Sequence, residues 1–142
     1  MRMHLRALLA LLLGLTLSTS ALARSGSGSH RVIRTYADGR GQTVLLYAGR
    51  GTGHRGDWGW LHIKGKHIDG IWYDGGRVTT FGQALGMRDD VQVQECIGTA
   101  LRQTPVYDRG RRQYRWRPAG ASYQVLVVVG ADGSIITAYP KR

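Results

Sequence analysis

The chain has 142 residues, with 20 Lys and Arg against 9 Asp and Glu, for a formal net charge of +11. Its length fits one domain, and its 42% of hydrophobic residues excludes a disordered basic tail. A single cysteine excludes an internal disulfide framework and a cysteine-rich zinc module. The positive charge indicates a polyanionic partner: nucleic acid, an anionic membrane surface or an acidic protein.

Residues 1–23 have the pattern of a cleaved secretory signal peptide. Arg2 and Arg6 form a positive amino-terminal region, residues 7–17 are an apolar run, and residues 21–23 (Ala-Leu-Ala) supply the small residues of a cleavage site. Cleavage would leave 18 basic residues against 9 acidic ones, a net charge of +9. We therefore expect a secreted or periplasmic protein. No later segment has the length and apolarity for membrane insertion, so no integral membrane association is expected.

A Gly/Ser-rich stretch over residues 24–30 is expected to be a flexible leader. A single domain is then predicted over residues 31–142. Its first element is a β-hairpin, with strands at residues 31–36 and 42–48 on either side of a turn at residues 38–39.

The middle of the chain is rich in glycine. Residues 49–59 hold five glycines and predict a loop, whereas residues 60–71 fit either a single helical turn or a strand. A turn at residues 74–76 and a brief extended segment at residues 77–81 are expected to follow.

The clearest helix begins after Asp89. Asp89 and Gln92 resemble a capping box, apolar residues recur at helical spacing as far as Leu101, and Pro105 ends the pattern. Cys96 lies on the apolar face of this helix and is expected to be buried. Strands are predicted at residues 114–117, 123–129 and 134–139. The predicted fold class is α+β, with a central antiparallel sheet packed against one or two helices.

Three histidines, at positions 54, 62 and 67, fall within fourteen residues. Histidine can take up and release a proton near neutral pH, and a reaction that needs a base and an acid together uses two of them. His62 and His67 form such a pair, with Lys64 and Lys66 between them. An isolated histidine is usually structural, but this clustering favours a catalytic pair. His54 is a rival partner for His62.

A metal site is the second interpretation of these histidines. The H-x₄-H spacing differs from the helical zinc pair, and no Glu follows His62 as a hydrolytic base would. Asp57, Asp69 and Asp74 offer oxygen ligands, but the neighbouring Lys and Arg residues oppose a bound cation. We therefore expect no metal and no cofactor.

A metal-free site with two histidines and many cations suits RNA. RNA carries its own nucleophile, the 2′-OH, so cleavage needs only a base, an acid and groups that stabilise the charged phosphorane. The product would be a 2′,3′-cyclic phosphate. Hydroxyl groups that could take part are those of Thr79, Thr80, Thr137 and Tyr139.

Residues 127–140 (VVVGADGSIITAYP) resemble the closing strand pair of bacterial EndoU-type ribonuclease domains. His62-Ile63, then Gly65-Lys66-His67 and then Thr79-Thr80-Phe81 follow the order of that family's upstream motifs, so the resemblance extends over residues 55–142. The wider group is the barnase–EndoU–colicin–RelE nuclease superfamily. RNase A-like bacterial toxin domains, which end in a similar T-x-Y-P, are the close alternative.

The resemblance implies a role for each matching residue. His62 and His67 would be the acid–base pair, and Thr137 and Tyr139 would face the scissile phosphate. These two are two residues apart on a strand and so share a face, while Ala138 points to the core. Phosphate binding would be completed by Thr80 or by Lys64 and Lys66. The resemblance also implies a toxin or effector role and a cognate inhibitor protein.

The chain departs from the family at two points. The second histidine of the family commonly follows a Gly-Gly pair, whereas His67 follows Lys66. The domain also follows a signal peptide here, instead of ending a large delivery protein.

The basic and aromatic stretch at residues 107–116 (YDRGRRQYRW) is a candidate RNA-binding surface. Arg111 and Arg112, with Arg109 and Arg115, would contact phosphates, and the aromatic residues would stack on bases. The alternative is a solvated basic loop that leads into a strand. Three tryptophans are expected to pack the core or frame the site: Trp58, Trp60 and Trp72.

The hypothesis is therefore a secreted, metal-independent endoribonuclease that acts on RNA as a monomer. The alternatives are a cationic envelope-binding protein without catalysis, and a partner-binding module on a degenerate nuclease fold.

Overall fold

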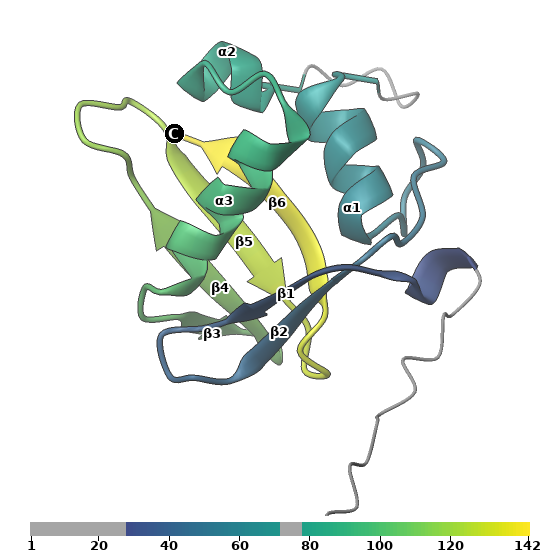
Figure 1. Cartoon of the computed structure of the whole chain (residues 1–142). Helices are drawn as coiled ribbons and strands as arrows, with labels where there is room; N and C mark the ends of the chain where they lie inside the picture. The colour runs from purple at the N-terminus through teal and green to yellow at the C-terminus, as the bar shows by residue number, and fades with distance from the viewer. Residues whose placement is uncertain (1–27, 72–77) are drawn as a thin grey trace, which may run out of the picture.

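The computed structural model describes residues 28–71 and 78–142 (Figure 1). The expected signal peptide, the start of the leader, the turn at residues 74–76 and Trp72 lie outside this part of the chain. The elements, in chain order, are η1 (Gly28–His30), β1 (Val32–Ala37), β2 (Thr43–Tyr47), α1 (Gly59–His62), η2 (Ile63–Ile68), α2 (Phe81–Leu85), α3 (Asp90–Leu101), β3 (Val106–Asp108), β4 (Arg111–Trp116), β5 (Gln124–Val129) and β6 (Ile135–Lys141).

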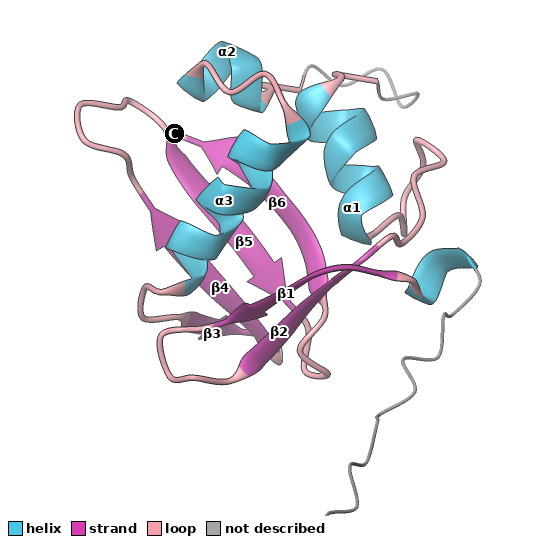
Figure 2. Ribbon diagram, in the orientation of Figure 1, coloured by secondary structure: helices cyan, strands magenta, loops and turns pink. Residues whose placement is uncertain are grey.

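The strands form two antiparallel sheets (Figure 2). Strands β3, β4, β5 and β6 pair in sequence order, and β1 pairs with β2 as the predicted hairpin. A parallel bridge between Leu45 and Ser134 joins the two sheets, and the Leu45 N–H donates to the Gly133 carbonyl at 3.0 Å. The predicted α+β class is confirmed.

Helix α3 covers one face of the four-stranded sheet (Figure 1). Its apolar side, which includes Val93 and Ile97, packs against a cross-strand row formed by Tyr114, Val127 and Ala138, all fully buried. Cys96 is buried beside them, as predicted. Burial of this apolar side is what makes the helix stable in water.

The amino terminus of α3 is capped by Asp89, whose carboxylate accepts from the Gln92 N–H at 2.8 Å. The Gln92 side chain accepts from the N–H of Arg88 rather than that of Asp89, so only half of the expected capping box forms. A complete capping box is found at α2, where Thr80 and Gln83 bond reciprocally.

A buried carboxylate joins the hairpin to the large sheet. Asp38, in the turn between β1 and β2, accepts from the Tyr114 hydroxyl at 2.8 Å and from Arg112 Nη1 at 3.2 Å. It also accepts from the N–H groups of Arg40 and Gln42. Burial opposes the ionised form, but these donors outweigh it and lower the pKa of Asp38.

Several boundaries differ from the sequence-based expectations. The end of the leader is a 3₁₀ turn at Gly28–His30, and the ambiguous stretch is helical over α1 and η2. Phe81 begins α2, so the predicted extended segment is wrong at that residue, while its first residue, 77, lies outside the described part of the chain. The basic stretch forms the hairpin of β3 and β4, and its residues 107–111 are exposed. Within the two described ranges, no helix has the length and apolarity to cross a membrane.

Candidate functional site

The two histidines predicted to act as a pair lie on a helix with an unusual winding. In an α-helix of 3.6 residues per turn, positions five apart point about 140° away from each other. Residues 63–68 instead form a π-helix, in which positions five apart are stacked, and the Asp69 N–H donates to the Lys64 carbonyl at 2.8 Å. The rings of His62 and His67 are consequently neighbours, with centroids 5.4 Å apart and planes at 84°.

Two glycines set the start of this helix against the end of β2. Gly49 (φ +69°) and Gly59 (φ +75°) both adopt left-handed backbone conformations. A Cβ on Gly49 would overlap the Trp58 carbonyl oxygen, and a Cβ on Gly59 would lie 2.8 Å from the Tyr47 carbonyl oxygen. Only glycine permits this close approach between the end of β2 and the start of α1. From there α1 and η2 pack against β6.

Strand β6 presents two hydroxyl side chains to the outer face of the sheet. Val129 pairs with Ile135 while Val128 pairs with Thr137, so Ile136 is the extra residue of a β-bulge. The bulge leaves Ile135 in the core and keeps Thr137 and Tyr139 on the opposite face from buried Ala138, as predicted.

Tyr139 joins this face to the histidines. Its ring stacks on that of His67, with centroids 5.4 Å apart and planes at 25°. His62, His67 and Tyr139 therefore form a continuous series of three rings, with Thr137 two residues along the same strand. The structure brings together all four predicted catalytic residues.

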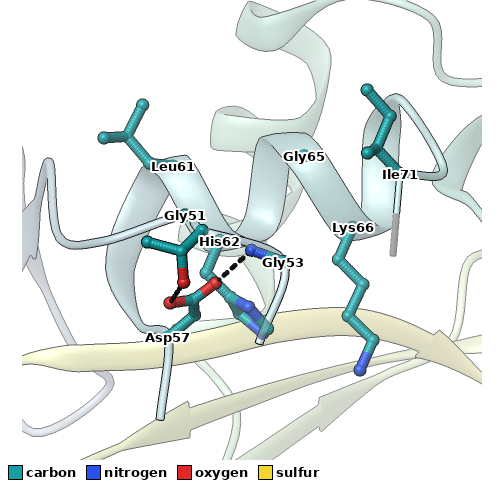
Figure 3. A pocket seen from close by; sticks show the side chains of 9 residues that line it. Gly51, Gly53, Asp57, Leu61, His62, Gly65, Lys66 and Ile71 are labelled. Atoms are coloured by element: carbon teal, nitrogen blue, oxygen red, sulfur yellow. Dashed lines mark hydrogen bonds between the residues drawn. The ribbon is translucent and has the colours of Figure 1, made fainter. Parts of the chain in front are cut away.

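A hollow of about 200 Å³, which we call the histidine hollow, lies on the His62 side of this series (Figure 3). His62 and Lys66 project into the site from the same helical segment, toward β6. Asp57 forms part of the wall and accepts from the Thr52 hydroxyl at 2.8 Å and the Gly53 N–H at 2.7 Å. Burial opposes its charge, but these hydrogen bonds outweigh it and lower the pKa of Asp57, so a carboxylate stands beside His62.

A second hollow, of about 360 Å³, lies on the Tyr139 side. We call it the arginine hollow, because Arg109 and Arg111 line it together with Thr137 and Tyr139. Arg109 has a left-handed backbone (φ +48°) in the turn between β3 and β4. Gln113 lies in the same cross-strand row as Thr137 and adds an amide to the wall.

The surroundings of both histidines favour the neutral form. Burial and the nearby positive charge of Lys66 lower the pKa of His62, while Asp57 partly opposes the shift. Burial, followed by the charges of His62 and Lys66, lowers the pKa of His67 to about 3. At neutral pH His67 is therefore a free base.

Two buried polar atoms of this site have no hydrogen-bond partner among the described residues: His67 Nδ1 and Thr137 Oγ1. Unpaired buried polar atoms are rare because each costs about 1–3 kcal/mol. His67 belongs to the series of rings and Thr137 lies beside it on β6, so both of these costs fall at the candidate site.

The remaining predicted binding residues divide into two groups. Lys66 and Arg111 line the two hollows, as the prediction requires. Lys64 instead forms an ion pair with Asp90 at 2.7 Å, Thr80 caps α2, and Arg112 is held by Asp38 and by Gln42 Oε1 at 2.6 Å. These three hold elements of the fold together.

The structure also locates His54 and two of the three tryptophans. His54 is exposed in the loop after β2, where its N–H donates to Asp57 Oδ2 at 3.3 Å, and the ring of His67 is a neighbour of that of His62. Trp60 is buried in the core, whereas Trp58 is half-buried and lines neither hollow. Over residues 28–71 and 78–142, no group of three His, Cys, Asp or Glu side chains is arranged to hold a metal ion.

Sequence reasoning did not single out Gln113 or the role of Asp57 beside His62. Gln113 carries a usable signal, since it alternates with Arg111 along a strand and so shares its face. The position of Asp57 depends on a loop without periodicity and has no such signal. Comparison with protein-family models and with curated proteins gives no match for this chain.

Proposed function

We propose that this protein is a secreted endoribonuclease that cleaves RNA without a metal, by attack of the 2′-OH on the adjacent phosphate. The observation that supports this most is the series His62–His67–Tyr139, with Thr137 beside it, between a histidine hollow and an arginine hollow. It combines two proton-transfer groups, two hydroxyls and positive charge in one place.

His67 is the base in this proposal. The lowered pKa keeps His67 neutral at pH 7, so its ring is available to take the proton of the 2′-OH as that oxygen attacks phosphorus, and the negative phosphate raises the pKa of the ring toward the range in which a base is effective. The P–O5′ bond then breaks. The products are a 2′,3′-cyclic phosphate and a 5′-hydroxyl, whose oxygen takes a proton from the acid.

His62 is the acid. Its pKa is lowered by burial and Lys66, but the Asp57 carboxylate opposes that shift, and an arriving phosphate adds a second negative charge. Binding of RNA thus favours protonation of His62 more than of His67. The Tyr139 and Thr137 hydroxyls and the Lys66 ammonium stabilise the phosphorane.

Arg109 and Arg111 hold the RNA backbone at the other end of the site. Both line the arginine hollow beside Tyr139. A guanidinium binds phosphate through two hydrogen bonds, so these two arginines can hold the RNA backbone next to the reacting groups. The amino-terminal 23 residues support secretion, and the ending I-I-T-A-Y-P supports an EndoU-type ribonuclease domain.

The test is digestion of single-stranded RNA by the purified mature protein in the presence of EDTA. We expect cleavage to cyclic-phosphate ends, and a loss of about 10²–10⁴-fold in His62→Ala and in His67→Ala. His54→Ala tests the rival pairing, and in this proposal it retains cleavage.

Intact RNA under all conditions would refute the ribonuclease, and tight binding of that intact RNA would support a non-catalytic binding module instead. Loss of cleavage in His54→Ala with retention in His67→Ala would show that the pair is assigned wrongly.

A further inference from the structure

A third hollow, of about 300 Å³, opens where the end of β2 meets the turn between β5 and β6. Three rings line it, from His30, Tyr47 and Trp58. Their centroids lie 5.9 Å (His30–Tyr47), 5.5 Å (His30–Trp58) and 6.0 Å (Tyr47–Trp58) apart, so they form one aromatic wall. We call this the aromatic hollow.

The aromatic hollow adjoins the arginine hollow. Ile136, the extra residue of the β6 bulge, lines both of them. A chain that passes Thr137 and Tyr139 in the arginine hollow therefore meets the three rings when it continues past Ile136. The bulge is what turns Ile136 outward, because regular alternation would place it on the face opposite Thr137.

The chemistry of the aromatic hollow suits a base better than a phosphate. Ring faces stack with any nucleobase. Asp132 also lines this hollow, and its carboxylate accepts from the Ser134 N–H at 3.0 Å and the Ser134 hydroxyl at 2.8 Å. These hydrogen bonds lower the pKa of Asp132, so the group is negatively charged and repels a phosphate. It also offers an acceptor to the amino and imino groups of a base.

We propose that the aromatic hollow binds an unpaired nucleobase of the RNA substrate, next to the nucleotide whose phosphate lies at Thr137 and Tyr139. This proposal rests on the proposed ribonuclease function. In this proposal His30, Tyr47 and Trp58 make the protein prefer single-stranded to double-stranded RNA, because a base that is paired within a duplex cannot enter the hollow and stack on these rings.

The test measures equilibrium binding of a short single-stranded oligodeoxynucleotide and of an abasic strand with the same number of phosphates. Neither probe has a 2′-OH, so neither is cleaved. We expect the wild type to bind the base-bearing strand at least about fivefold more tightly. Tyr47→Leu and His30→Ala should each reduce that preference. His30 is exposed, so its replacement leaves the core intact even if Tyr47→Leu impairs folding.

Tyr123→Ala is the matched control. Its ring is half-buried like that of Tyr47 but stacks on Arg142, away from the aromatic hollow, and the preference should stay unchanged. Equal binding of the two strands by the wild type, or a preference that survives His30→Ala, would overturn the proposal. Base-dependent binding without any cleavage of RNA would support the base-binding site in the aromatic hollow and refute the proposed ribonuclease function.

Discussion

The ring of His62 lies 5.4 Å from that of His67 and nearly perpendicular to it, although the two residues are five positions apart. Regular α-helical winding would direct them to different sides of the helix. The π-helix at Ile63–Ile68 brings them to one side, and there Tyr139 continues the contact. Single-turn π segments are rare, and many of those known lie at functional sites. The π-helix of this protein likewise carries residues of the candidate site.

Tyr139 has two roles that substitution can separate. Tyr139→Phe keeps the ring that stacks on His67 and removes the hydroxyl, so RNA cleavage should fall by about 10²-fold while the melting temperature stays constant. Tyr139→Ala also removes the stacking partner and should lower cleavage further. Rates under single-turnover conditions measure both. Full activity in Tyr139→Phe would remove the hydroxyl from the mechanism.

The neutral state of His67 makes the fold sensitive to acid. The unfolded chain binds a proton at this residue below about pH 6.5, whereas the folded protein does so only near pH 3, so stability is lost as the pH falls between these values. At pH 4.5 the free energy of unfolding should have dropped by about 2–3 kcal/mol from this residue.

His67→Gln provides the comparison, because it cannot titrate but keeps a similar polar group. Urea unfolding at pH 7 and pH 4.5 should show a smaller loss in His67→Gln than in the wild type. Equal losses would mean that His67 is protonated in the folded protein.

Two neighbouring arginines should give opposite phenotypes. Arg111 lines the arginine hollow, so Arg111→Ala should weaken RNA binding and reduce the slope of log affinity against log salt by about 0.7 for each phosphate that the variant no longer neutralises. Arg112 is held by Asp38, so Arg112→Ala should instead lower thermal stability and leave the salt slope unchanged. Filter binding of RNA at several salt concentrations, with thermal melts, tests both. The reverse pattern would exchange their roles.

The buried carboxylate of Asp38 should be important for stability. Asp38→Ala leaves Arg112 and the Tyr114 hydroxyl without their acceptor and should cost about 3–5 kcal/mol in the free energy of unfolding. Glu95→Ala is the control, because the Glu95–Arg34 pair is 3.6 Å apart with side chains 66% and 36% exposed, and should cost less than about 1 kcal/mol. Chemical denaturation of both variants measures the difference, and similar costs would contradict the role of Asp38.

The crossing of β2 and α1 should depend on Gly49. Gly49→Ala forces a Cβ into the Trp58 carbonyl and a left-handed backbone onto alanine, and should destabilise the fold by about 2–5 kcal/mol. In Gly65→Ala, apart from the adjacent residues and the helix's own backbone, no described atom lies within 4 Å of the new Cβ. That variant should be as stable as the wild type or more stable by up to about 1 kcal/mol. Melting curves distinguish the two, and a harmless Gly49→Ala would contradict the close approach.

Local sequence patterns are sufficient to predict much of this fold. The spacing of Val93, Cys96 and Ile97 predicts the helix that covers the sheet, and the alternation at Thr137 and Tyr139 predicts their common face. Both follow from the period of a single element. The capping box at Thr80 was equally local, but the short α2 that it begins has too few residues to show a period.

The sequence by itself determined the inventory of the site: the histidines, hydroxyls and cations that suit phosphate chemistry, and the elements that carry most of them. Only the tertiary structure decided which of these groups meet. Lys66 and Arg111 line hollows, while Lys64 and Arg112, one or two positions away, are bound to Asp90 and Asp38. Such partners come from distant parts of the chain, and charge alone does not select among them. The π-helix that brings His62 next to His67 likewise packs against β6, a contact between distant parts of the chain that no local pattern encodes.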